Sequence, residues 1–190
     1  SRGIKMLVVA CNTASALALP KIRETIGLDV VGVIGPGARK AAKIADRIGV
    51  IATEATVSSG AYEKAIKLAK ETAEVIQTAC PLFVPLSEEG WTQEVETFSI
   101  AKRYLSKIIE FQPEAVVLGC THYPLIEHLF RAALPQNIAE QTKKLRHDSV
   151  CTQNLAEALE VAARITPASG LIVVCGSLYL AGELLSYLTT

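Results

Sequence analysis

The sequence lacks an excess of charge of either sign and is poor in aromatic side chains. Its 190 residues include 19 basic and 19 acidic side chains, and only 5% of the residues are aromatic. A protein that binds nucleic acid usually has a basic excess or an aromatic stacking surface, so we expect no nucleic-acid partner. Apolar residues make up 50% of the chain, which excludes an intrinsically disordered protein and predicts a folded one.

Long apolar runs are also missing. The longest, such as residues 6–11 and 171–175, are far shorter than the roughly 20 residues that a membrane-spanning helix needs. We therefore expect no membrane partner. No secretory leader precedes the strand-like run around Met6, so we expect a cytoplasmic location.

The sequence has no metal-binding spacing of cysteine and histidine. Its five cysteines make an odd count without a Cys-x-x-Cys pair, and its three histidines complete no cluster with them. We expect reduced thiols and no metal. The cysteines that we expect to pack as small apolar side chains are Cys80, Cys151 and Cys175.

Short, solidly apolar runs alternate along the chain with longer amphipathic stretches. The runs that we predict as strands are residues 4–10, 30–34, 47–53, 74–79, 115–119 and 171–176. The stretches that we predict as helices are residues 13–26, 37–46, 56–70, 92–111, 123–133, 155–164 and 178–188. Continuous apolar runs are typical of parallel strands that helices cover on both faces.

The sequence therefore predicts an α/β fold for residues 1–190. We expect a single domain with a flavodoxin- or Rossmann-like parallel sheet of about six or seven strands and helices on both faces. A second architecture is also open. In it, residues 30–135 form one unit, and residues 4–26 form a small lobe together with the C-terminal tail.

Two of the predicted strands end in a cysteine that polar residues follow. The two segments are Cys11-Asn12-Thr13 and Cys120-Thr121-His122. Ligands bind at the carboxyl ends of strands in open α/β sheets, and a helix amino terminus lowers the pKa of a thiol. The pattern predicts thiol acid–base groups around a small anionic substrate. A single cysteine at a strand end is more often a buried apolar residue, and His122 is also consistent with a solvated helix cap.

Three blocks of the sequence resemble the signature blocks of the bacterial glutamate racemases. They are residues 10–16 (ACNTASA), 79–86 (ACPLFVPL) and 118–125 (LGCTHYPL). The resemblance covers about residues 4–135 and implies a cofactor-independent isomerase of the aspartate/glutamate racemase superfamily. In such an enzyme one cysteine removes the α-proton of glutamate and another delivers a proton to the opposite face. The product supplies a peptidoglycan precursor.

The resemblance also implies the role of each site residue. The implied catalytic residues are Cys11, Cys120 and His122, with His122 assisting Cys120. The implied glutamate-binding residues are Asn12, Thr13, Thr121 and Glu88. For Glu88 a solvated acidic turn is an alternative interpretation.

The C-terminal part resembles a different protein. Residues 154–159 and 172–185 are similar to the last α-β-α segment of folylpolyglutamate synthase, over about residues 145–190. We therefore expect an engineered or recombined chimera of residues 1–137 and 147–190, joined by a polar seam at 138–146. No GxxxxGK[ST] phosphate-binding loop is present, which excludes synthase activity for the chain alone.

The resemblance further implies impaired catalysis, because glutamate racemases carry an aspartate-bearing segment ahead of their Cys-Asn-Thr block. We therefore expect either a chimeric protein without normal activity, or residual racemase or anion-binding activity at Cys120-Thr121-His122. A homodimer is a further expectation, since Cys11 would be exposed on a shortened lobe.

Overall fold

The computed structural model describes residues 6–134 of the chain. The strands in this part are β1 (Met6–Val9), β2 (Asp29–Gly32), β3 (Arg47–Ala52), β4 (Glu74–Ala79) and β5 (Ala115–Gly119). They form two parallel sheets with the strand orders β1-β2 and β4-β3-β5. The predicted α/β class and the parallel pairing are confirmed.

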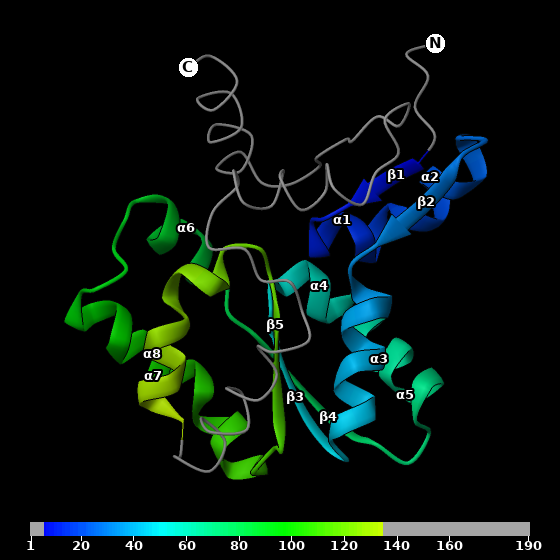
Figure 1. The fold of residues 1–190 in the computed structure, drawn as a ribbon. Coiled ribbons are helices and arrows are strands. Elements are labelled where there is room, and N and C mark those ends of the chain that lie inside the picture. Colours follow the sequence, from blue (N-terminus) through cyan, green and yellow to red (C-terminus); the bar gives the residue numbers. More distant parts are fainter. Residues whose placement is uncertain (1–5, 135–190) are drawn as a thin grey trace, which may run out of the picture.

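The described residues form two sheets, of two and three strands, and not part of one sheet of six or seven strands as predicted. Both edges of β3 are occupied, by β4 and β5, so no edge of β3 is left for β2, which pairs with β1 instead. The small β1-β2 sheet lies beyond the carboxyl ends of β3 and β5, where α1 and α4 are in contact (Figure 1). The predicted elements at 155–164, 171–176 and 178–188 and the seam at 138–146 lie outside the described residues.

Helices cover both faces of the three-stranded sheet. The helical elements are α1 (Asn12–Leu17), α2 (Leu19–Thr25), α3 (Ile34–Ile44), α4 (Glu54–Ser58), α5 (Ala61–Ala69), α6 (Phe83–Glu88), α7 (Val95–Phe111), the 3-10 helix η1 (Tyr123–Ile126) and α8 (Glu127–Ala133). One apolar core joins α3 and α5 to the sheet, and a second core joins α6, α7, η1 and α8 to its other face (Figure 1). This unit therefore has three layers, with β3 buried in the middle.

Two of the predicted helices are broken in the structure. The stretch 13–26 divides into α1 and α2, because Pro20 in the first turn of α2 has no backbone N–H with which to continue α1. The stretch 56–70 divides at Gly60, whose φ of 64° is left-handed. Helix α6 follows β4 in a segment for which no helix was predicted from the sequence.

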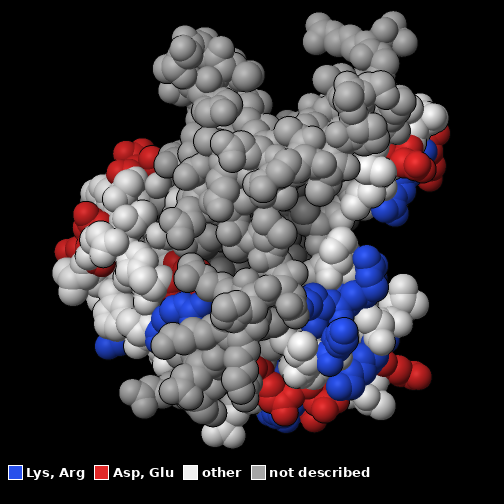
Figure 2. Space-filling model, in the orientation of Figure 1, with Lys and Arg blue, Asp and Glu red and all other residues white. Residues whose placement is uncertain are grey.

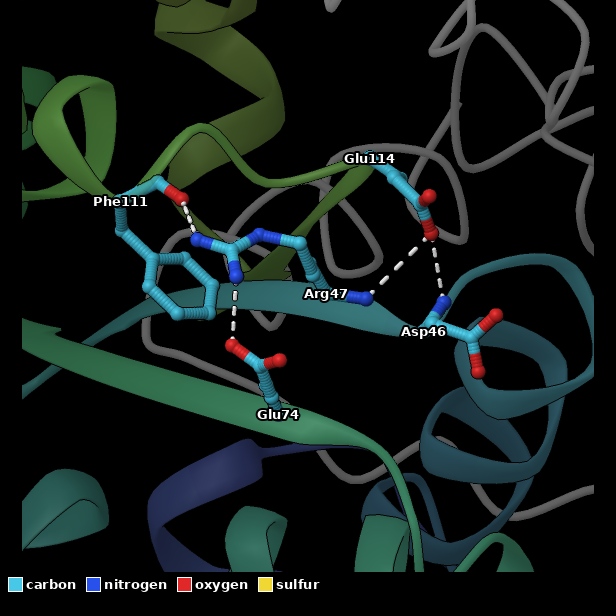
Figure 3. A network of polar contacts seen from close by, with 5 residues as sticks. All are labelled: Asp46, Arg47, Glu74, Phe111 and Glu114. Atoms are coloured by element: carbon cyan, nitrogen blue, oxygen red, sulfur yellow. Dashed lines mark hydrogen bonds and ion pairs between the residues drawn. The ribbon is translucent and has the colours of Figure 1, made fainter.

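Side chains at the amino ends of the three strands fix their register (Figure 3). The Arg47 guanidinium binds Glu74 Oε2 at 2.5 Å, donates to the Phe111 carbonyl, and lies 4.3 Å from the centre of the Phe111 ring. Glu114 Oε2 accepts from the backbone N–H of Asp46 at 2.6 Å and of Arg47 at 3.3 Å. Arg47 begins β3, Glu74 begins β4 and Glu114 precedes β5, so these contacts fix the amino ends of the three strands. The polar residues of the predicted site follow the strands at the opposite, carboxyl end of the sheet.

No helix within residues 6–134 is long and apolar enough to cross a membrane. Figure 2 shows basic side chains gathered over α3, with acidic side chains beside them.

The stability of this fold is expected to fall as the pH rises through the alkaline range. Burial raises the pKa of Cys80 from 9.0 to about 12 and that of Tyr62 from 10.0 to about 12. Between its two pKa values each group has lost its proton in the unfolded chain and keeps it in the folded chain. Each group therefore lowers the free energy of unfolding by up to about 1.4 kcal/mol per pH unit. Urea unfolding from pH 8 to 11.5 measures the slope. Cys80→Ala should flatten it, and equal slopes for the two proteins would contradict this assignment.

Candidate active site

Cys11 stands where β1 ends and α1 begins. It is the N-cap residue of α1, and its Sγ accepts a hydrogen bond from the backbone N–H of Ala14 at 3.5 Å. The thiol is half-buried. Among the described residues no carboxylate or imidazole bonds to it, so the structure gives this thiol a backbone donor but no base.

Thr13, two residues after Cys11, joins α1 to the amino end of α4. Its hydroxyl lies 2.9 Å from Thr53 Oγ1 and 3.1 Å from Thr56 Oγ1, and those two atoms are 2.9 Å apart. Thr53 follows β3 directly and caps α4. Sequence reasoning assigned no role to Thr53 and Thr56. Thr53 directly follows its strand as Cys120 does, and this position is the signal that could have identified it.

Cys120 follows β5 and begins a chain of three titratable groups. The distance from its Sγ to His122 Nδ1 is 3.7 Å, and His122 Nε2 lies 3.0 Å from Glu88 Oε1. His122 is only 6% exposed and its side chain makes no cap hydrogen bond, so its interpretation as a solvated helix cap is wrong. Glu88 is partly exposed but bonds to His122, so it is more than a solvated turn residue.

The apolar core holds Glu88 opposite His122. Phe83, in the same short helix as Glu88, packs edge-on against Tyr123, the residue after His122, with ring centres 5.4 Å apart. Tyr123 also donates from its hydroxyl to the Cys80 carbonyl at 2.9 Å. Because α6 and η1 share this packing, the carboxylate and the imidazole are fixed relative to each other.

The electrostatic surroundings of Cys120 favour its protonated thiol. Burial raises the pKa of Cys120, and the backbone N–H groups of His122 and Thr121 lower it. A negative charge on Cys11 or Glu88 raises the pKa of Cys120 further. A thiolate on Cys11 therefore favours a neutral thiol on Cys120.

Asn12, the remaining predicted residue of the first segment, is buried. Its side-chain Oδ1 accepts a hydrogen bond of 2.6 Å from the hydroxyl of Tyr62 on α5. Sequence reasoning gave no role to Tyr62. The structure thus brings the residues of the two predicted segments and Glu88 to the carboxyl ends of the strands, where the two sheets meet.

Metal ligands do not gather in this region. Within residues 6–134 no group of three histidine, cysteine, aspartate or glutamate side chains is arranged to hold a metal ion. Cys80 is fully buried, whereas Cys151 and Cys175 lie outside the described residues.

The fold and the site define an α/β protein of parallel sheets in which each sheet presents a cysteine, with polar neighbours, at the carboxyl end of a strand. The chain belongs to the Asp/Glu/hydantoin racemase family, whose model matches residues 1–143. Both cysteine segments lie within the matched residues.

Curated relatives and solved structures agree with this assignment. The chain is 46% identical over 170 residues to the glutamate racemase of Geobacter metallireducens, covering 88% of this chain and 62% of the relative. It is 49% identical over 139 residues to that of Gloeothece citriformis, covering 73% and 50%. The structure of glutamate racemase from Francisella tularensis in complex with D-glutamate matches with a TM-score of 0.68 and 27% identity, over 98% of this chain and 70% of that one. The chain spans about half to three fifths of the length of these curated relatives.

A second family model matches the C-terminal part. The model of the dihydrofolate synthetase C-terminal domain matches residues 103–187, and it overlaps the racemase match over residues 103–143. The alignment with the Geobacter relative is longer than the segment 4–135 in which we saw the racemase resemblance. The similarity to racemases therefore continues beyond that segment.

Proposed function

We propose that the chain binds glutamate between its two sheets and exchanges the α-proton of glutamate through Cys11 and Cys120. The observation that carries this proposal is the chain of contacts from Cys120 through His122 to Glu88. Thiol, imidazole and carboxylate in this order form a proton-transfer arrangement. The names of the relatives support glutamate as the substrate.

The reaction needs one base and one acid on opposite faces of the α-carbon. A thiolate removes the α-proton and becomes a thiol, while the opposite thiol gives its proton to the carbanion and becomes a thiolate. One C–H bond breaks, one forms, and the configuration inverts. His122 removes the proton of Cys120 in one direction and returns it in the other, and Glu88 stabilises the imidazolium that forms.

Polar groups near the cysteines hold the substrate in this proposal. The amide of Asn12, the hydroxyl of Thr13 and the residue Thr121 bind the carboxylate and ammonium groups of glutamate. Thr53 and Thr56 fix the Thr13 hydroxyl through the contacts described above. A substrate held in this way presents its α-carbon to both sulfurs.

Exchange of the α-hydrogen tests the proposal directly. D- or L-glutamate is incubated with the chain in deuterated water, and the loss of the α-proton signal is followed by NMR together with the optical rotation. We expect loss of the signal from both enantiomers and decay of the rotation. Exchange no faster than in buffer would overturn the catalytic proposal.

A second candidate is glutamate binding without turnover. It is favoured by one observation: among the described residues, the Cys11 thiol bonds only to a backbone N–H and to no base. Loss of one member of an acid–base pair typically lowers a rate by about two to four orders of magnitude. Calorimetry separates the candidates, because heat of binding without exchange in the same solution supports binding alone.

We also propose a composite origin for the chain, with the C-terminal segment from a second source. The match of residues 103–187 to the dihydrofolate synthetase domain supports it, and a natural glutamate racemase gene that encodes residues 138–190 as they stand here would overturn it. The cytoplasmic location and the homodimer stay predictions. Cell fractionation tests the location, and sedimentation velocity tests the homodimer.

A further inference from the structure

Tyr62 is a buried tyrosine whose hydroxyl belongs to the candidate site. It lies on α5, is 3% exposed, and donates to Oδ1 of Asn12, which is 8% exposed, at 2.6 Å. The bond joins residues 50 positions apart, one beside each sheet. A hydrogen bond this short between two buried side chains fixes the rotation of the amide that receives it.

The ring of Tyr62 is held against the strand that leads to Cys120. A Cβ added at Gly119 would lie 3.1 Å from Tyr62 Cε2, and one added at Gly37 would lie 3.7 Å from the Tyr62 hydroxyl oxygen. The distance at Gly119 is shorter than an ordinary contact, so the ring fits against the end of β5 because Gly119 has no side chain, whereas at Gly37 the contact would be an ordinary one. The hydroxyl therefore has little freedom to leave Asn12.

The direction of this hydrogen bond determines what Asn12 can do. Burial raises the pKa of Tyr62 to about 12, and a thiolate on Cys120 contributes to the shift, so the phenol keeps its proton and acts as the donor. The acceptor is then the carbonyl oxygen of the amide. No described residue accepts from the amide nitrogen of Asn12, so both of its N–H groups are available within this part of the chain.

We propose that Tyr62 is a positioning residue that orients the side-chain amide of Asn12 so that its N–H groups point to the substrate carboxylate. The inference rests on the proposed function, because Asn12 binds glutamate in that proposal. Without the hydroxyl, the amide can rotate and place its carbonyl oxygen toward the carboxylate, which repels it. Tyr62 thus acts on substrate binding and not on proton transfer.

Tyr62→Phe tests the inference, since it removes only the hydroxyl and keeps the ring. We expect the Kd for D-glutamate, measured by calorimetry, and the KM for exchange to rise about fivefold to tenfold, with kcat within about twofold of the original chain. In an Asn12→Ala background, the same substitution should leave the Kd unchanged. Tyr104→Phe is the matched control, because it also removes only a tyrosine hydroxyl, on α7, that bonds to no described residue of the candidate site, and it should leave the Kd unchanged.

The possible outcomes separate this inference from the proposed function. Equal effects of Tyr62→Phe with and without the Asn12 amide, or no effect at all, overturn the inference even if exchange is fast. Glutamate binding that depends on both residues supports it even if exchange is absent and the catalytic proposal fails. A chain that binds no glutamate overturns both.

Discussion

Replacing Cys120 by alanine is expected to abolish the exchange of the glutamate α-hydrogen. In the proposed reaction each thiol acts on one face of the α-carbon, so the variant loses either the base or the acid for every turnover. Positioned proton transfer contributes roughly two to four orders of magnitude to a rate. We expect the exchange rate to fall by at least about a hundredfold for both enantiomers.

Cys80→Ala is a matched control for Cys120→Ala. It removes the same atoms from another buried cysteine, whose thiol packs in the apolar core and hydrogen-bonds only to the Thr78 carbonyl among the described groups. We expect it to keep its exchange rate and to lose stability comparably. NMR in deuterated water measures the rate, and urea unfolding measures the stability. If Cys120→Ala exchanges as fast as Cys80→Ala, the sulfur of Cys120 carries no proton in the reaction.

Much of the candidate site could be predicted from the sequence because its parts are local. Cys11 and Cys120 each follow a solidly apolar strand, and the position of a residue after such a strand determines the edge of the sheet that it reaches. Their polar neighbours follow within two positions. The predicted strands at 74–79 and 115–119 agree with β4 and β5 to the residue. For β5 the reason is a short, solidly apolar run, which leaves little choice of limits.

The remaining features depend on contacts between distant residues. The division into two sheets depends on which strands pair with one another, and no local pattern encodes that choice. The hydrogen bond of Tyr62 to Asn12 spans 50 positions, and that of His122 to Glu88 spans 34. Glu88 was identified through the resemblance to a family and not through its neighbours. Such partners become visible only when the packing of α5 and α6 is known.

Replacing His122 by asparagine is expected to slow exchange about tenfold to a hundredfold at neutral pH. Asparagine retains a polar group near Cys120 but cannot take up a proton. Burial raises the pKa of the Cys120 thiol, so without the imidazole the thiolate forms only as the solution becomes alkaline. The rate of the variant should therefore rise more steeply with pH than that of the original chain.

A pH profile of exchange from pH 6 to 10 distinguishes this role from a structural one. His128→Asn is the matched control, because His128 is exposed and its Nε2 bonds only to the Thr92 carbonyl, at 2.9 Å, among the described groups. That variant should keep both the rate and the profile. A His122→Asn profile parallel to the original one would mean that the imidazole only supports the fold. A profile that converges with the original at high pH means that hydroxide replaces the imidazole as the base that ionises Cys120. In that case the contact between Cys120 and His122 is what allows a buried thiol to work at neutral pH.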